Sequence, residues 1–362
     1  MNIRFPKPLA QGDVIAITAP SSGIPAPLYP HLDQAIDALR KRGYLVIEGE
    51  CLRQHYKSAS ATRQQRASEL MRLLTEPDIA AVMPPWGGEL AMELLPLLGF
   101  RALENVPAKW FSGFSDLSTL HLPLTTKAGW ATLHGPNLMQ LGSSDIDAVT
   151  AAIWDVLTLQ PGTRFSQSAS RHHQSKDTDS SAGSDAGPSL EDETSWKRLD
   201  GSKSDLKLSG RLIGGCLDTI SRLAGTAFGN VPRFVEASGT DGTLLYLENA
   251  EMTPCNLARA LLGLRLNGWF DGVSGVLIGR NAGPESAQSD DLSYIDALQS
   301  VLGDVHCPVI YDMDIGHVPP QLSLVNGALA EVELRDGHGT VVQQLEDSRP
   351  KYSSRKLRHS LW

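Results

Sequence analysis

The sequence predicts an α/β protein in two parts: an N-terminal α/β domain built on a parallel sheet, and a smaller, mixed α/β C-terminal domain. Three observations predict this fold class. Short apolar runs alternate with segments of helical periodicity in the first half, a pattern typical of a parallel sheet covered by helices. A long polar stretch separates the halves. The last part of the chain carries the turn signals of antiparallel hairpins.

In the N-terminal part, strands and helices are expected to follow one another regularly. The apolar runs predict strands at 13–19, 44–47, 79–83, 108–111 and 130–133. Apolar residues at helical spacing predict helices around 32–39, 61–74, 89–95, 117–124 and 145–157. Gly43 follows the first of these helices, at a position typical of a helix end.

The C-terminal part repeats the alternation and then changes character. Strands are expected at 243–247, 276–278 and 309–311, and helices at 217–224, 254–267 and 294–302. Thr253 and Pro254 form an N-cap followed by proline at the first helical position. Asn326-Gly327 and Asp336-Gly337 are hairpin turn signals between alternating runs. We therefore expect the chain to finish in small antiparallel strands.

Composition divides the chain into domains at 1–160 and 208–346, a polar flexible linker or loop at 161–207 and a tail at 347–362. The linker has hardly any apolar residues and cannot bury enough surface to offset its conformational entropy. Trp196 is its exception, and an aromatic residue there is either a docking point on the surface or a cover over a ligand. The basic residues of the tail are interpreted as solvated. They are Lys351, Arg355, Lys356 and Arg358.

Charge and motifs exclude several classes of function. The net charge of −9 argues against a nucleic acid or an anionic membrane as partner. The four cysteines lie far apart and never form C-x-x-C, so no zinc or redox motif is indicated. No nucleotide-binding glycine motif and no H-E-x-x-H occurs. With no apolar leader and no run of 18 apolar residues, we expect a soluble, cytoplasmic protein without metal or cofactor.

The segment around Ser115 carries the first candidate for chemistry. An apolar strand ends near Gly113, which supplies a bend, and a helical pattern begins at Leu117. A serine on such a strand-to-helix corner resembles a nucleophile elbow, although the usual second glycine is replaced by Leu117. A serine that only caps a helix or forms a turn is the alternative.

Glu248 and His317 share this placement, because each follows an apolar strand. A serine needs an imidazole to accept its proton, and the imidazole needs a carboxylate to fix its tautomer. Alternatives stay open: Glu248 could cap its strand or pair with Arg259, and His134 also ends a strand and rivals His317 as the base.

Three blocks of residues together resemble the LD-carboxypeptidase family of serine peptidases, which also contains the microcin C immunity proteins. The blocks follow the family in order and spacing over nearly the whole chain. The first comprises 86–88, 93–96, 111–116 and 134–136, the second 210–215 and 223–226, and the third 245–248 and 314–317.

The resemblance implies a catalytic triad in which Ser115 is the nucleophile, His317 the general base and acid, and Glu248 the orienting carboxylate. It implies an oxyanion hole made of the backbone N–H groups of Asp116 and of Gly88 or its neighbour. It also implies a site at the junction of the two domains, in a homodimer without metal or cofactor.

The glycine loop and its flanks line the pocket in this family, so Trp86 and Gly87 are expected to contact substrate. The immunity branch has a longer interdomain loop with a tryptophan that can stack on a base, and Trp196 fits that role. The chain departs from the family pattern at Glu89, where tyrosine or asparagine is frequent, and at Cys216, where asparagine is common. These departures affect the pocket and leave the three triad positions intact.

The function implied by the resemblance is that of an L,D-carboxypeptidase that removes a terminal D-amino acid from cytoplasmic muropeptides during peptidoglycan recycling. The alternative is an immunity-type hydrolase that cleaves the amide of an aminoacyl-nucleotide. A second alternative, of another class, is a noncatalytic two-domain protein that clamps a small ligand. In the first two cases the partner is a small peptide or an aminoacyl-nucleotide substrate, with no nucleic acid and no membrane.

Overall fold

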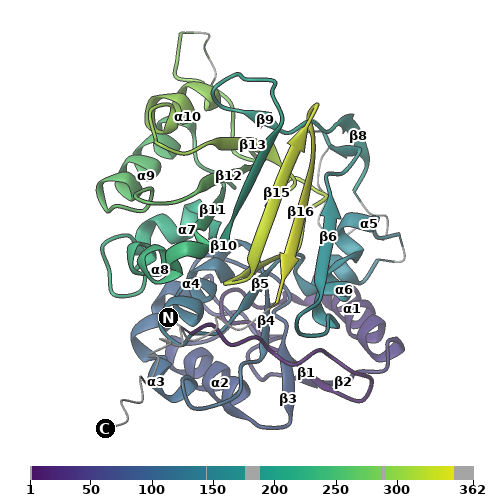
Figure 1. Cartoon of the computed structure of the whole chain (residues 1–362). Coiled ribbons are helices and arrows are strands. Elements are labelled where there is room, and N and C mark those ends of the chain that lie inside the picture. The colour runs from purple at the N-terminus through teal and green to yellow at the C-terminus, as the bar shows by residue number, and fades with distance from the viewer. Residues whose placement is uncertain (1, 144, 176–187, 287, 289, 346–362) are drawn as a thin grey trace, which may run out of the picture.

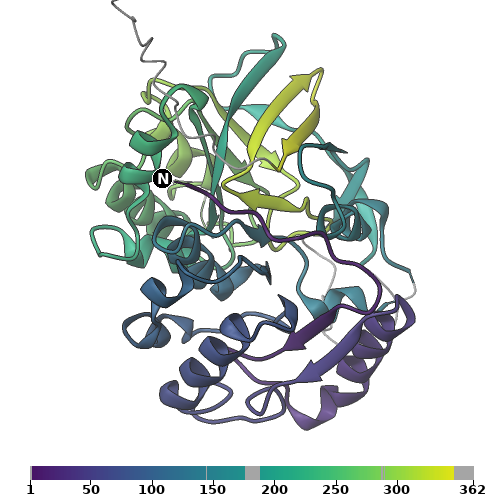
Figure 2. The same ribbon diagram turned by 60° about the horizontal axis from the view of Figure 1, so that its bottom comes forward.

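The computed structural model describes residues 2–143, 145–175, 188–286, 288 and 290–345, so the predicted tail at 347–362 lies outside the described residues. The N-terminal half, purple and blue in Figure 1, forms one α/β unit, and the green and yellow C-terminal half forms another. Figure 2 shows the same division from a view turned by 60°. Within the described part of the chain, no helix combines the length and apolar character needed to cross a membrane.

The first unit is built on a six-stranded sheet in the order β14-β5-β4-β3-β1-β2. All its neighbours pair in parallel except β14, which is antiparallel to β5. The strands are β1 (Val14–Ile17), β2 (Leu45–Glu48), β3 (Ile79–Val82), β4 (Trp110–Gly113), β5 (Thr132–His134) and β14 (Leu324–Asn326). The predicted strands of the N-terminal half are present, and β14 comes from the far end of the chain.

The helices of the first unit follow the predicted alternation with β1 to β5. They are α1 (Tyr29–Lys41), α2 (Arg63–Thr75), α3 (Phe100–Leu103), α4 (Ser118–Thr126), α5 (Ala148–Ala151) and α6 (Ile153–Leu157), with short 3-10 turns that include η2 (Ala91–Leu97) and η3 (Ser115–Leu117). Thr62 and Gln65 form a capping box at the start of α2. Every residue of α4 is buried, because α4 contacts β5 of its own sheet and β10 (Leu206–Cys216) of the other.

The second unit is built on an eight-stranded sheet in the order β6-β16-β15-β10-β11-β12-β13-β9. The central four, β10 to β13, are parallel, and the outer strands pair antiparallel. The strands are β6 (Arg164–Ser168), β9 (Lys197–Arg198), β10 (Leu206–Cys216), β11 (Thr243–Glu248), β12 (Gly275–Gly279), β13 (Val309–Met313), β15 (Leu329–Arg335) and β16 (His338–Gln344). The helices are α7 (Leu217–Ile220), α8 (Val231–Ser238), α9 (Pro254–Leu266) and α10 (Tyr294–Leu302).

The segment 161–207 differs from the predicted flexible linker in its described part. β6 pairs with β16 and β9 pairs with β13, while β7 (His172–Gln174) and β8 (Leu190–Glu193) pair with each other. Backbone hydrogen bonds to existing strands order this segment, and such bonds do not require the apolar residues that the composition lacks. The domain boundaries at residues 160 and 207 stay a prediction.

The two hairpin signals have different outcomes. Asp336-Gly337 forms the tight turn between β15 and β16, with positive φ at both residues. Asn326-Gly327 does not form a hairpin within one sheet, because β14 leaves the second unit and pairs with β5. The Asn326 side chain lies between the two sheets, where its oxygen accepts from Tyr246 Oη at 2.8 Å and its nitrogen donates to Thr132 at 3.2 Å.

Candidate active site

Ser115 lies on the turn between β4 and the helical segment formed by η3 and α4. Its φ is +66°, in the left-handed region that residues with a Cβ rarely adopt. Gly113 has a φ of +132°, and a side chain there would collide with Leu117 and Asn137. The Asn137 side chain also accepts a hydrogen bond from the Phe114 N–H at 3.1 Å. The turn therefore holds the serine in a strained and fixed conformation, which is the geometry of a nucleophile elbow.

The structure brings Ser115, His317 and Glu248 together from three distant parts of the chain. His317 Nε2 lies 3.0 Å from Ser115 Oγ, and His317 Nδ1 lies 2.8 Å from Glu248 Oε2. Glu248 ends β11 and is completely buried, whereas the His317 side chain keeps 26% of its surface exposed. Gly316 has a φ of +95°, and a Cβ on it would overlap the Glu248 carboxylate. A relay from hydroxyl to imidazole to carboxylate is therefore geometrically complete.

The charges around His317 favour its protonated form. Burial by itself lowers the pKa of His317, but the Glu248 carboxylate beside it, with Asp218 and Glu251 further away, outweighs burial and raises the pKa above its ordinary value. An imidazole with a raised pKa is a stronger base toward a serine hydroxyl. This arrangement can accept a proton from Ser115 and stabilise the resulting imidazolium.

The glycine pair Gly87-Gly88 lies directly against the Ser115 turn. A Cβ on Gly87 would stand 2.8 Å from Ser115 Cβ and 2.9 Å from the Asp116 backbone nitrogen. Gly88 has a φ of +139°, and a Cβ there would meet the Ser22 backbone nitrogen at 2.8 Å. The backbone of this loop can approach the serine closely only because both residues are glycine. Gly88 and Asp116 therefore lie where backbone N–H groups could receive a developing oxyanion, and this role stays a prediction.

Trp196 does not lie where a substrate-stacking residue is expected. Its side chain is buried in the smaller apolar core, and its indole N–H donates to the Asp314 carboxylate at 2.7 Å. Gly339 leaves the space that the ring fills, because any Cβ there would overlap the indole. Trp86 is half-buried against the main core and donates its indole N–H to the Ser22 carbonyl at 2.8 Å. Neither tryptophan lines the cavity at Ser115.

His134, the rival base, is buried and packs edge-on against Phe114 and Tyr246. Burial holds the pKa of His134 well below its ordinary value, and the positive field of His121 and His317 adds to this. Neither ring nitrogen of His134 has a hydrogen-bond partner among the described residues. His134 is therefore a neutral core residue, and His317 is the histidine that contacts Ser115.

Comparison with known protein families decides the relationship. Residues 15–135 match the LD-carboxypeptidase N-terminal domain, and residues 209–332 match the LD-carboxypeptidase C-terminal domain. The chain belongs to the LD-carboxypeptidase family. The resemblance deduced from the three sequence blocks is thereby confirmed, and this family member is a hydrolase of the serine peptidase type.

Several relatives of this LD-carboxypeptidase family member span almost its whole length. The microcin C7 self-immunity protein MccF of Escherichia coli is 25% identical over 93% of this chain and 95% of its own. A structure of MccF in complex with aspartyl sulfamoyl adenosine matches with a TM-score of 0.79 at 23% identity, covering 94% of this chain and 98% of that one. The muramoyltetrapeptide carboxypeptidase of Oxalobacter formigenes matches with a TM-score of 0.70 at 22% identity, covering 92% and 100%. Both structures share the two-unit α/β fold.

A cavity of about 490 Å³ opens onto Ser115 and His317 in this LD-carboxypeptidase family member. Its lining is predominantly acidic, with one arginine. The charged lining residues are Glu89, Glu93, Asp116, Asp218, Arg222 and Glu251. The pKa of Glu89 is raised, chiefly by its partial burial and secondly by the nearby carboxylates of Glu251, Asp116 and Asp218. The sequence interpretation did not identify Asp218, Arg222 or Glu251 as cavity residues. Asp218 follows the carboxyl end of β10, which is the signal that could have identified it.

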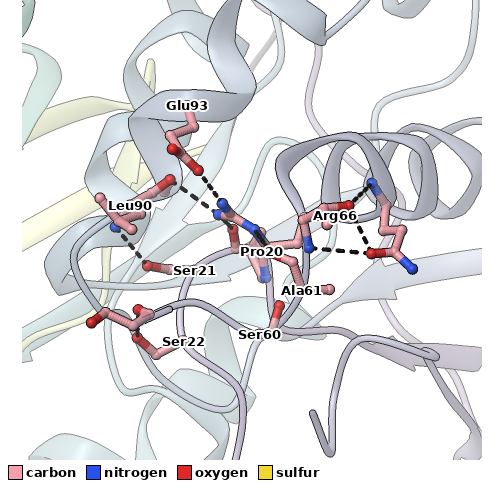
Figure 3. A network of polar contacts seen from close by, with 12 residues as sticks. Pro20, Ser21, Ser22, Ser60, Ala61, Arg66, Leu90 and Glu93 are labelled. Atoms are coloured by element: carbon pink, nitrogen blue, oxygen red, sulfur yellow. Dashed lines mark hydrogen bonds and ion pairs between the residues drawn. The ribbon is translucent and has the colours of Figure 1, made fainter. Parts of the chain in front are cut away.

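A buried arginine holds together the loops that surround the glycine pair. Figure 3 shows Arg66, which is 1% exposed, between the Pro20 loop and the start of η2. Arg66 donates to the carbonyl oxygens of Pro20 at 2.8 Å, Ala61 at 3.0 Å and Leu90 at 3.0 Å, and to the Glu93 carboxylate at 2.5 Å. One side chain thus joins the loops at Pro20 and Ala61 to the segment that follows Gly87-Gly88.

The Asp116 side chain connects this network to the nucleophile turn. Its carboxylate accepts from Ser21 Oγ at 2.5 Å and from the Ala91 N–H at 2.8 Å. Ser21 in turn accepts from the Leu90 N–H at 3.3 Å. Burial raises the pKa of the Asp116 carboxyl, and the hydrogen bonds from Ser21 and Ala91 act in the opposite direction. The sequence interpretation assigned Asp116 a backbone role only, and its side chain adds a structural one.

Proposed function

We propose that this protein is a serine carboxypeptidase that hydrolyses an amide bond by means of Ser115, His317 and Glu248. The observation that carries the proposal is the pair of hydrogen bonds, 3.0 Å and 2.8 Å long, that joins the three side chains in line. The alternative of a noncatalytic clamp gives no reason for a strained serine to point at an imidazole whose other nitrogen meets a buried carboxylate.

In the proposed reaction, Ser115 Oγ attacks the carbonyl carbon of the scissile amide while His317 Nε2 accepts the hydroxyl proton. The backbone N–H groups of Asp116 and Gly88 receive the negative charge that develops on the carbonyl oxygen. Losing one such donor costs about 3 kcal/mol of transition-state stabilisation. His317 then protonates the leaving amine, and the C–N bond breaks to give an acyl-enzyme.

Water completes the cycle in the second half of the reaction. His317, neutral again, accepts a proton from the water that attacks the acyl carbon. The imidazolium then returns the proton to Ser115 Oγ as the C–O bond breaks and the acid product leaves. Glu248 keeps the proton of neutral His317 on Nδ1, so that Nε2 always faces the serine as an acceptor. The buried carboxylate also stabilises the imidazolium that forms in each half-reaction.

The substrate proposed first is a muropeptide in the cytoplasm, from which the enzyme removes a terminal D-amino acid. Two observations support this choice. The family is that of the LD-carboxypeptidases, and a muramoyltetrapeptide carboxypeptidase shares the fold over 92% of this chain. In addition, Trp196 is packed in the core, so it does not offer a face for stacking on a nucleobase. The homodimer implied by the resemblance belongs to this proposal, and analytical ultracentrifugation would test it.

The second candidate is hydrolysis of an aminoacyl-nucleotide amide. It is favoured by the similarity to MccF, which extends over 93% of this chain in sequence. It is also favoured by the fold shared with MccF in complex with aspartyl sulfamoyl adenosine, at a TM-score of 0.79. The cavity beside Ser115, at about 490 Å³, lies within the range typical of small-molecule sites.

A covalent probe and two substrates test the proposal. The full chain is treated with a fluorophosphonate, and it is separately incubated with a muropeptide tetrapeptide and with an aminoacyl sulfamoyl adenosine, release being followed by mass spectrometry. We expect labelling at Ser115 and release of a D-amino acid from the tetrapeptide. Ser115→Ala abolishes both, whereas Ser300→Ala, which changes an exposed serine on α10, leaves both unchanged. Absence of labelling combined with ligand binding would favour the noncatalytic clamp.

A further inference from the structure

A thiol, a carboxylate and an imidazole converge beside the nucleophile. One ligand atom from each of Cys216, Glu248 and His317 lies within 4.8 Å of the others. Cys216 ends β10 and is the in-register partner of Glu248 at the end of β11, so the sheet itself sets these two side chains next to each other. The Cys216 thiol is reduced and buried. The proposed reaction uses Glu248 and His317 but gives no role to Cys216.

These donor types suit one class of ion. Thiolate sulfur, imidazole nitrogen and carboxylate oxygen are the ligands that Zn²⁺ takes in proteins. Around a tetrahedral Zn²⁺, such atoms stand roughly 3.4 to 3.6 Å apart, as follows from the metal–ligand distances. Side chains whose ligand atoms already lie within 4.8 Å can reach this spacing by small rotations. Three protein ligands leave a fourth position for water.

A second observation points to a cation at this place. Glu248 is completely buried, one of its oxygens bonds to His317, and the other, Oε1, has no hydrogen-bond partner among the described residues. A buried carboxylate oxygen without a partner is costly, and a bound cation would remove that cost. Cys216 and His317 both line the cavity, so an ion can reach them from outside. The acidic lining, including Asp218 and Glu251, raises the local concentration of cations.

We propose that Cys216, Glu248 and His317 form a binding site for a thiophilic divalent cation, with Zn²⁺ as the test ion, and that its occupancy switches the hydrolase off. The loss of activity rests on the proposed function, whereas the binding does not. Binding releases the Cys216 proton and transfers no electron. If the cation takes His317 Nδ1, the ring proton moves to Nε2, which then donates to Ser115. If the cation takes Nε2, the acceptor is occupied directly. In both cases the serine has no base.

The site is tested first by binding, with the full-length protein. Zn²⁺ affinity is measured by titration calorimetry, and Co²⁺ is added separately to detect the ultraviolet absorption of a cobalt–thiolate bond. We expect one ion per chain and a cobalt–thiolate band in the wild type. Cys216→Ala and the near-isosteric Cys216→Ser should both lose the band. Their Zn²⁺ affinity should fall by more than the roughly 10- to 100-fold that loss of an outer-shell partner costs. Cys255→Ala, which removes an exposed thiol on α9, is the matched control and should bind as the wild type does.

Inhibition is then measured as the ratio of hydrolysis with and without Zn²⁺ within each variant. The wild type and Cys255→Ala should lose activity and regain it with a chelator, and both Cys216 variants should need much more Zn²⁺ for the same loss. Equal Zn²⁺ affinity in the wild type and the Cys216 variants would overturn the proposal, as would absence of the cobalt–thiolate band. A protein that binds the ion but that, when stripped of metal by a chelator, a fluorophosphonate does not label at Ser115 would overturn the proposed function and leave the cation site standing.

Discussion

Glu248→Gln is the substitution that tests the proposed relay most directly. Glutamine keeps the size of the buried side chain and one hydrogen bond to His317, but removes the charge 2.8 Å from Nδ1. With an effective dielectric constant of about 20, a unit charge pair at that distance is worth about 6 kcal/mol. A loss of that size corresponds to a rate factor of about 10⁴, at 1.36 kcal/mol for each tenfold change. Because glutamine keeps a hydrogen bond, we expect kcat to fall about 10³- to 10⁴-fold.

The pH dependence of the same variant tests the cause of the loss. Neutral His317 is the base, so kcat/KM of the wild type falls as the pH drops through the raised pKa of His317. Without the Glu248 charge, burial dominates and lowers that pKa, so the acidic limb of the variant moves to lower pH.

The assay is amide hydrolysis over a pH series, with circular dichroism to verify folding. Glu236→Gln, which neutralises an exposed carboxylate on α8, is the control and should leave the profile unchanged. A folded Glu248→Gln variant with more than a tenth of wild-type activity, or with an acidic limb at higher pH, would refute the reasoning.

Three further substitutions test the surroundings of the site. Gly316→Ala places a Cβ against the Glu248 carboxylate, at a residue with positive φ, and should abolish turnover. Wild-type kinetics in this variant would show that the Cβ does not displace Glu248. Arg66→Met leaves three carbonyl oxygens, two of them buried, without their donor and should lower the free energy of unfolding in urea by about 3 kcal/mol. An unchanged urea midpoint would show that the network contributes nothing. Trp196→Phe removes the indole N–H that donates a hydrogen bond to the Asp314 carboxylate. It should lower the melting temperature and leave KM for both substrates unchanged. A rise in KM for the nucleotide substrate alone would instead support stacking.

The parts of the site that could be predicted are those that depend on local rules. Ser115, Glu248 and His317 are candidates because each follows the carboxyl end of an apolar strand, and Gly113 marks the bend. The choice of His317 over His134 as the base comes from the resemblance to the family. The sequence alone could not establish their mutual distances, because Ser115 comes from the first sheet and the other two from the second. The buried helix α4, which contacts β5 and β10, brings those sheets together.

The parts that could not be predicted depend on contacts between distant segments. Trp196 fills a space left by Gly339, which lies far along the chain and carries no local signal of that contact. Arg66 is buried on α2 without any local signal of that burial, since its partners are carbonyl oxygens of separate loops. In the described part of the polar segment, β6 and β9 form because β16 and β13 offer unpaired backbone groups at the edges of the sheet.

β14 lies late in the sequence but belongs to the first sheet, and this affects whether the two halves of the protein can be expressed separately. Because β14 supplies the last strand of the N-terminal sheet, a fragment ending near residue 160 would lack it and leave β5 uncovered. An exposed edge strand with unpaired backbone N–H and C=O groups promotes self-association. The two halves of the coding region are therefore expected to yield well-behaved protein only when translated together, or when a synthetic peptide spanning 324–326 and its flanks is added to the shorter product.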